Sequence, residues 1–300
     1  MIIMRTKQEP IDVIRTVFDL DRSQSVDIRI LEKGMTNKSF LFSINNIKYI
    51  LRAPGEGTDQ LIDREQEQAV YAAIKGRGLC DEPVFIDPKS GYKITRFLEN
   101  VRTCNPYCEA DVRQCMGKLK AFHEMELTVR HEFDVFEKIR MYEDLWGSRP
   151  SIYLDYDLTK ERIWELQSFI KDIPRKICLT HIDAVPDNFL FHTLPDGTEE
   201  LQLTDWEYSG MQDPHMDIAM FSIYSLYNKQ QIDSLIDIYF QNQCDTVTRF
   251  KIYAYVSICG LLWSNWCEFK RNLGIEFGDY ASKQYEYAKE YYHYAVQEIK

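Results

Sequence analysis

The chain has 300 residues, 45% hydrophobic and 13% aromatic, with a formal net charge of −11 at pH 7. This composition supplies a large core for a bilobal or two-domain unit. The negative charge argues against a nucleic-acid backbone as partner, because both would repel each other. The longest apolar run, residues 253–263, is too short to span a bilayer, and the N-terminus lacks the apolar stretch of a secretory signal.

The eight cysteines contain no C-x-x-C pair and no zinc-ligand spacing, so reduced thiols are expected. We therefore expect a cytoplasmic protein without membrane insertion. An acidic protein is also compatible with a small cationic substrate. The oligomeric state is left open.

The first hundred residues predict a small antiparallel sheet with helices. Short apolar runs separated by polar turns predict strands at residues 26–31, 39–44, 48–52, 83–87 and 93–98. An apolar stripe at helical spacing predicts a helix at residues 61–74, ended by Gly76 and Gly78, after a shorter helix at residues 11–19.

Gly34 lies at the bend between two of these strands, followed by the small polar residues Thr36 and Asn37. A glycine there allows backbone N–H groups to approach a nucleotide's phosphates, although the same residues also suit an ordinary hairpin turn.

Arg52 ends a predicted strand and is a candidate phosphate-binding cation. A guanidinium keeps its charge when buried and can hold phosphate oxygens bidentately. Glu65 and Glu67, on the next predicted helix, are candidates to pair with it. For either acid taken alone, a solvated position on the helix face is the favoured interpretation.

The composition becomes more polar in residues 97–106, which we interpret as a linker between two lobes. Backbone groups at Phe97 and Leu98 are therefore candidates to bind an adenine.

Beyond the linker the periodicity is helical, and helices are predicted at residues 110–124, 132–145, 159–171, 232–242, 247–269 and 280–300. Another helix is predicted after Asp213. Asp217 precedes an apolar run there and is expected to cap this helix, with bracing of a loop elsewhere as the alternative.

The most informative stretch is His181-x-Asp183-x-x-x-x-Asn188, followed by a Pro195–Gly197 turn and Asp205. The turn predicts a β-hairpin that brings Asn188 and Asp205 toward one site. Phosphoryl transfer needs a carboxylate to accept the nucleophile's proton, plus oxygen ligands for Mg²⁺. The step from Asp183 to Asn188 matches the kinase catalytic loop. The competing interpretation is that each Asp only stabilises its turn.

Together these residues are similar to the choline/ethanolamine kinase family, especially its bacterial members, within the aminoglycoside phosphotransferase-like kinases. The resemblance covers about residues 30–295, and its stretches are Gly34–Asn37, Tyr49–Gly55, His181–Asn188, Asp205–Tyr208, Asp217–Ala219, Leu262–Trp266 and Ile275–Tyr280.

The resemblance implies an α+β, protein-kinase-like bilobal fold that uses ATP and Mg²⁺. Residues 1–98 would form a β-rich nucleotide-binding lobe and residues 99–300 a mainly helical lobe with the substrate pocket. By position, Asp183 would orient and deprotonate the choline hydroxyl. The metal would be held by Asn188 and Asp205, with help from Glu207, and the phosphates by Arg52, steadied by Glu67.

Trp263 and Trp266 are three residues apart on a predicted helix and project from one face. Paired aromatics at this spacing are usually core, but ring faces also bind a trimethylammonium group that has no N–H to donate. Tyr224 and Tyr227 are further candidates for a choline pocket. Eukaryotic relatives place an acid on the helix after Asp-Ile, and residues 220–227 contain none.

Two alternatives stay open. A kinase of the same fold acting on ethanolamine would have hydrogen-bond acceptors rather than aromatic rings in its pocket. One acting on an aminoglycoside would need a wide acidic groove. Thiamine is a further candidate substrate. The second alternative is a non-catalytic nucleotide-binding or scaffold protein that keeps the fold, against which the intact Asp183, Asn188 and Asp205 argue.

Overall fold

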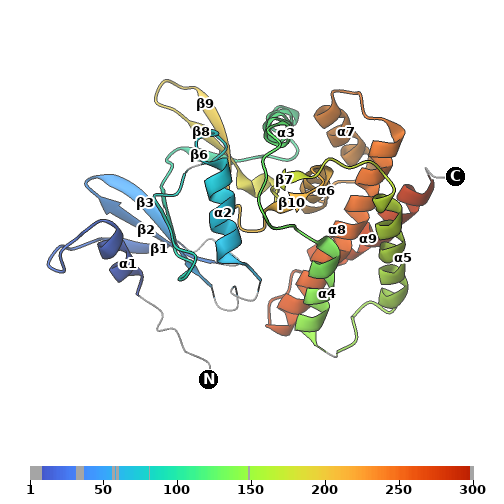
Figure 1. Cartoon of the computed structure of the whole chain (residues 1–300), viewed down its shortest axis with the longest axis horizontal. Coiled ribbons are helices and arrows are strands. Elements are labelled where there is room, and N and C mark those ends of the chain that lie inside the picture. Colours follow the sequence, from blue (N-terminus) through green and yellow to red (C-terminus); the bar gives the residue numbers. More distant parts are fainter. Residues whose placement is uncertain are drawn as a thin grey trace. The chain divides into compact units, whose positions relative to one another are not determined.

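The structure is a computed structural model that describes residues 9–31, 37–55, 58, 61–80, 82–147 and 149–297. The chain folds into two compact units (Figure 1). The first comprises Met1–Arg102 and Leu190–Tyr208, and the second Thr103–Phe189 and Ser209–Lys300. The first unit thus takes in a hairpin that the sequence analysis assigned to the second lobe, because strand pairing ties that hairpin to residues just before the boundary.

The first unit is built on a five-stranded antiparallel sheet in the order β1-β2-β3-β5-β4. The turn between β2 and β3 is Asn45–Asn46, both with positive φ (50° and 64°), which asparagine tolerates and a tight hairpin requires. The strands are β1 (Ile28–Leu31), β2 (Asn37–Ile44), β3 (Ile47–Pro54), β4 (Phe85–Ile86) and β5 (Lys93–Arg96).

One face of this sheet is covered by helix α1 (Pro10–Val17) (Figure 1). Val13 and Ile14 of α1 pack onto the sheet because its apolar residues fall on one helical face. The cluster they join contains Phe42, Tyr49, Leu51, Ala53, Tyr92 and Ile94.

Helix α2 (Arg64–Ile74) begins three residues later than predicted because Asp63 caps it, accepting hydrogen bonds from the backbone N–H groups of Glu65 and Gln66. Its buried face includes Glu67, Val70, Tyr71 and Ile74, at steps of three, four and seven. A carboxylate is therefore buried on the same helical face as the apolar side chains.

The predicted linker contains a strand, β6 (Val101–Thr103), which the polar composition concealed. It joins β8 (Phe189–Thr193) and β9 (Glu199–Leu203) in a three-stranded sheet ordered β6-β8-β9. The predicted hairpin is confirmed: the Leu194 N–H donates to the Thr198 carbonyl at 2.8 Å, and Gly197 has φ +84°. Asn188 directly precedes β8, and Asp205 lies two residues after the end of β9.

The second unit is mainly helical, with one antiparallel strand pair. Strand β10 (Gly210–Gln212) was not predicted; it pairs with β7 (Cys178–Thr180). The helices are α3 (Glu109–Glu124), α4 (Val135–Trp146), α5 (Tyr156–Lys171), α6 (His215–Tyr224), α7 (Lys229–Phe240), α8 (Thr246–Asn272) and α9 (Asp279–Gln297). Among the described residues no helix is long and apolar enough to cross a membrane.

Helix α8 is the core of this unit: it is buried almost throughout and packs against α4, α5, α6 and α9. At Gly260 the backbone of α9 leaves no room for a side chain. A Cβ atom at Gly260 would lie 2.7 Å from the Gln284 carbonyl oxygen and 2.8 Å from the Ala288 amide nitrogen, both backbone atoms that cannot rotate away.

We therefore expect Gly260→Ala to lower the free energy of unfolding by about 1–3 kcal/mol through overpacking. The matched control is Gly117→Ala in α3, where no atom beyond the local helix backbone and the neighbouring residues lies within 4 Å of the new Cβ. That change should raise stability by roughly 0.5–1 kcal/mol, since alanine favours a helix interior. Urea denaturation measures both; a Gly260→Ala protein as stable as the wild type would contradict the close packing.

Candidate active site

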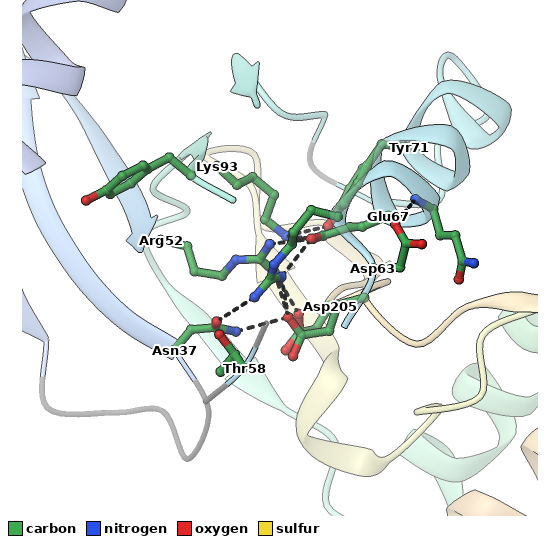
Figure 2. A network of polar contacts seen from close by, with 12 residues as sticks. Asn37, Arg52, Thr58, Asp63, Glu67, Tyr71, Lys93 and Asp205 are labelled. Atoms are coloured by element: carbon green, nitrogen blue, oxygen red, sulfur yellow. Dashed lines mark hydrogen bonds and ion pairs between the residues drawn. The ribbon is translucent and has the colours of Figure 1, made fainter. Parts of the chain in front are cut away.

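Arg52, on β3, is the centre of a buried network of charges in the first unit (Figure 2). Its Nη2 lies 2.6 Å from both carboxylate oxygens of Glu67. Its Nη1 makes longer contacts, 3.2 Å to Glu207 and 3.4 Å to Asp205. Glu67 is therefore the acid that pairs with Arg52, whereas Glu65 is exposed.

A second arginine, Arg64, completes the network and was missed in the sequence analysis. Its Nη1 donates to Glu67 at 2.9 Å and to Glu207 at 3.0 Å. Its Nη2 donates to the Asn37 side-chain oxygen at 3.2 Å, and the Asn37 amide donates to Glu207 at 3.0 Å. The available signal was spacing, because Arg64 precedes Glu67 by three residues on α2.

Lys93 on β5 is the third cation, with Nζ 3.5 Å from Glu67 and 2.6 Å from the Tyr71 hydroxyl (Figure 2). Burial alone would raise the pKa of Glu67, but Lys93, Arg52 and Arg64 together lower it to about 2. Glu67 is therefore ionised at neutral pH.

Glu207 responds in the opposite direction. Burial and the neighbouring Asp205 raise its pKa, and the two arginines only partly oppose this. The acids act on Arg52 in turn: burial disfavours its charge, but Glu67, Glu207 and Asp205 outweigh burial and raise its pKa. The network is thus held by mutual compensation of buried charges.

Asp205 is the most accessible acid of this network, with a side chain 42% exposed. Its backbone has φ +65°, a left-handed conformation that is uncommon for residues other than glycine. The following Trp206 is fully buried and donates from Nε1 to the Leu203 carbonyl at 2.8 Å, which anchors the turn after β9. An accessible carboxylate on an anchored, strained turn suits a metal ligand.

In the second unit, Asp217 holds the segment that carries Asp183. Its carboxylate accepts the backbone N–H groups of His181 (2.9 Å) and Ile182 (2.7 Å), and a hydrogen bond joins it to His123 Nε2 (2.9 Å). Ile182 has φ +70°, which is strained for a β-branched residue.

The expectation that Asp217 caps its helix was wrong, because α6 begins two residues earlier, with Pro214 at its N-cap. The alternative interpretation, that Asp217 braces a loop elsewhere, is the one that its hydrogen bonds to residues 181 and 182 confirm.

Asn188 fixes the Asp183 side chain. Its amide nitrogen donates to the Asp183 carbonyl at 2.8 Å and to the Asp183 carboxylate at 3.0 Å. The amide nitrogen is turned toward Asp183, and the amide oxygen is the kind of ligand atom that Mg²⁺ prefers, so Asn188 stays a candidate metal ligand. Asn188 in the second unit and Asp205 in the first each supply an oxygen ligand of the chemical type that suits magnesium.

Five aromatic side chains of the second unit form a continuous series of ring contacts, called here the aromatic group: Trp263, Trp266, Phe277, Tyr280 and Tyr224. Successive ring centroids lie 5.3, 4.8, 6.4 and 6.2 Å apart. Sequence reasoning had named the two tryptophans and Tyr224. It missed Phe277 and Tyr280, although both lie in the 275–280 stretch that carried the family resemblance.

The aromatic group already binds one cation: Lys270 Nζ lies 5.4 Å from the centre of the Trp266 ring. The other four residues are half-buried, so none of them is fully enclosed: Trp263, Phe277, Tyr280 and Tyr224. The group thus has ring surface available for a further cation.

Tyr224 links the aromatic group to the loop that carries Asp183, because its hydroxyl donates to Asp187 at 2.6 Å. Burial, and then Asp187 and Asp183, raise the pKa of the Tyr224 hydroxyl. Tyr227 lies elsewhere: it is buried, its hydroxyl bonds the Pro106 carbonyl, and its ring contacts Tyr107 and Phe221. Its placement gives no support to a role in the same pocket.

The remaining expectations concern the nucleotide. Gly34 and Thr36 lie outside the described residues. Phe97 and Leu98 are half-buried directly after β5, and the Phe97 N–H donates to the Lys48 carbonyl at 2.9 Å. Their adenine-binding role stays a prediction.

The charge network predicts a pH-dependent stability. An unfolded Glu67 titrates near 4.5 and the folded one near 2, so its stabilising charge acts fully above about pH 4.5 and is lost as the pH falls toward 2. We expect Glu67→Gln to destabilise by about 3 kcal/mol at pH 7, and by clearly less at pH 3.5.

Urea denaturation at both pH values measures this difference. Glu65→Gln is the control, because Glu65 is exposed on the same helix; it should change stability by less than about 0.5 kcal/mol. A Glu67→Gln effect of the same size at both pH values would contradict the assignment.

Comparisons with known proteins agree with this geometry. The chain is 32% identical over 270 residues to protein LicA of Haemophilus influenzae, covering 85% of this chain and 77% of that protein. The crystal structure of choline kinase LicA from Streptococcus pneumoniae matches with a TM-score of 0.79 and 28% identity, covering 94% of this chain and 98% of that one. A structure of LicA in complex with AMP matches with a TM-score of 0.78 and 28% identity, covering 96% of this chain and 100% of that one.

These matches identify the fold as the mixed, protein-kinase-like one expected, and the chain as a nucleotide-using kinase. The model of the choline/ethanolamine kinase family matches residues 28–238, more than two thirds of the chain. The chain belongs to the choline/ethanolamine kinase family.

Proposed function

We propose that the chain transfers the γ-phosphoryl group of ATP to the hydroxyl of choline, giving phosphocholine. The observation that carries this proposal is the aromatic group, hydrogen-bonded through Tyr224 to the loop of Asp183. The relation to a solved choline kinase supports the same acceptor.

The acceptor follows from the chemistry of the rings. A trimethylammonium group has no N–H to donate, so hydrogen-bond acceptors on the protein add little to its binding free energy. Each aromatic face contributes about 0.5–2 kcal/mol. The ammonium group of ethanolamine has N–H donors and would instead bind best to hydrogen-bond acceptors on the protein. In the aromatic group only the hydroxyls of Tyr224 and Tyr280 can accept, and that of Tyr224 already donates to Asp187.

Asp183 is the proposed base. A hydrogen bond from Asn188 orients its carboxylate, and a second holds its backbone carbonyl. The carboxylate can then align the choline hydroxyl and accept its proton as the oxygen attacks the γ-phosphorus in line. Asn188 and Asp205, with Glu207, would hold Mg²⁺. When bound, the metal supplies neutralisation of the charge on the transferring phosphoryl group.

Arg52 is the proposed phosphate-binding residue. Its Nη2 is committed to Glu67 at 2.6 Å, whereas its Nη1 contacts are longer, at 3.2 and 3.4 Å. We infer that Arg52 Nη1 gives up its contacts with Glu207 and Asp205 to bind a phosphate oxygen, while the ion pair with Glu67 keeps the Arg52 side chain in place. Arg64 compensates by retaining Glu207.

The nearest alternative is a kinase of the same fold with another acceptor, and a non-catalytic nucleotide-binding protein is more remote. An ADP-release assay with choline, ethanolamine, thiamine and kanamycin separates them. We expect the highest kcat/KM with choline. Higher activity with another acceptor would replace the proposed substrate, and no ADP release with any acceptor would contradict a catalytic role.

The role of Asp183 predicts that Asp183→Asn lowers kcat by about 10²- to 10⁴-fold, because the substituted amide cannot accept the proton. The Kd for ATP and the melting temperature should change little, since Asp183 is not among the phosphate-binding residues. Steady-state kinetics with ATP titration measure both. A kcat within tenfold of the wild type would rule Asp183 out as the base.

The aromatic group predicts that Trp263→Ala raises the KM for choline by about 2- to 30-fold, the loss of one ring face, with the KM for ATP unchanged. Trp164→Ala is the matched control: Trp164 is also half-buried, but it lies on α5 and contacts Phe136, Arg140 and Lys160. Equal effects of the two substitutions on the choline KM would argue that Trp263 acts only through the fold.

A further inference from the structure

Asp187 follows Asp183 by four residues in the catalytic loop and is exposed. One of its carboxylate oxygens accepts a hydrogen bond from the Tyr224 hydroxyl at 2.6 Å, and Tyr224 is the last residue of α6. The other oxygen accepts no hydrogen bond from any residue that the structure describes. The bond therefore holds one end of an exposed carboxylate and leaves its charge accessible.

Tyr224 is also a member of the aromatic group, with its ring 6.2 Å from Tyr280 in an edge-on contact. The same side chain thus touches the rings through its own ring and an anion through its hydroxyl. A cation that rests on the Tyr224 ring lies near the carboxylate that accepts the Tyr224 hydroxyl at 2.6 Å, and opposite charges attract appreciably at such short range.

The aromatic group needs such an anion for a cationic ligand. Lys270, with Nζ 5.4 Å from the Trp266 ring, places a positive charge against the group. Asp183 also contributes negative charge, but as the base it gains a proton during the reaction. The other acids near the rings include Glu276 and Asp279, which are exposed and flank Phe277 and Tyr280 in sequence, and Glu268, which is buried and paired with Arg271.

We propose that Asp187 is the anion that offsets the positive charge of the acceptor, and that Tyr224 positions it beside the aromatic group. This inference rests on the proposed function. It makes Asp187 a determinant of specificity for cationic over neutral alcohols, while the rings determine the fit of the methyl groups. Asp187 takes no part in proton transfer.

The test replaces Asp187 with Asn, which keeps an oxygen that can accept the Tyr224 hydrogen bond but removes the charge. We expect the KM for choline to rise about tenfold, with kcat within threefold and the KM for ATP unchanged. The Ki of 3,3-dimethylbutan-1-ol, the uncharged carbon analogue of choline, should not change. Tyr224→Phe leaves the Asp187 carboxylate charged but removes the hydroxyl that holds it in position. A smaller rise of about threefold in the choline KM is therefore expected.

Glu276→Gln removes another exposed acid beside the same rings and should leave the choline KM within twofold of the wild type. The proposal is overturned if Glu276→Gln gives the larger effect, or if Asp187→Asn weakens choline and its uncharged analogue equally. It is also overturned if Asp187→Asn leaves the KM for choline unchanged in an enzyme whose wild type phosphorylates choline. Failure of the wild type to phosphorylate choline would instead contradict the proposed function.

Discussion

The buried ion pair between Arg52 and Glu67 is the interaction on which the first unit's charged site depends. Burying two charges costs several kcal/mol in lost hydration, and a well-packed apolar pair would often be more stable. The cost is offset here because Lys93 and Arg64 join Arg52 in outweighing burial, so that the pKa of Glu67 falls to about 2. This network costs free energy to bury, but it holds the Arg52 guanidinium in one position. Such fixed positioning is what a phosphate-binding residue requires.

The second unit uses a buried carboxylate for a different purpose. Asp217 accepts two backbone N–H groups of the catalytic loop and thereby holds Ile182 in a strained conformation next to Asp183. Strain of this kind persists only where the surroundings impose it. In the first unit buried Glu67 positions the Arg52 cation, and in the second buried Asp217 positions the backbone of residues 181–182. Each half of the proposed chemistry therefore depends on an acid that takes no part in the reaction.

Local sequence signals predicted much of this. The spacing of Asp183 and Asn188, the Pro195–Gly197 turn and the helical position of Glu67 are short-range patterns, and the hairpin and the Arg52–Glu67 pair are present. Contacts made by distant segments escaped prediction: Arg64 bonded to Glu207, β6 paired with β8, and Phe277 packed on Trp266. Tyr227 was grouped with Tyr224 by spacing alone, and tertiary packing turned it toward Pro106.

The central claim, that ring faces rather than hydrogen-bond acceptors select the acceptor alcohol, is tested most directly by competition. Equal concentrations of choline and ethanolamine are supplied with limiting ATP, and the two phosphorylated products are quantified by ³¹P NMR; their ratio equals the ratio of the two kcat/KM values. The account predicts that phosphocholine predominates by at least about tenfold. A product dominated by phosphoethanolamine, or ATP consumed to inorganic phosphate alone, would contradict it.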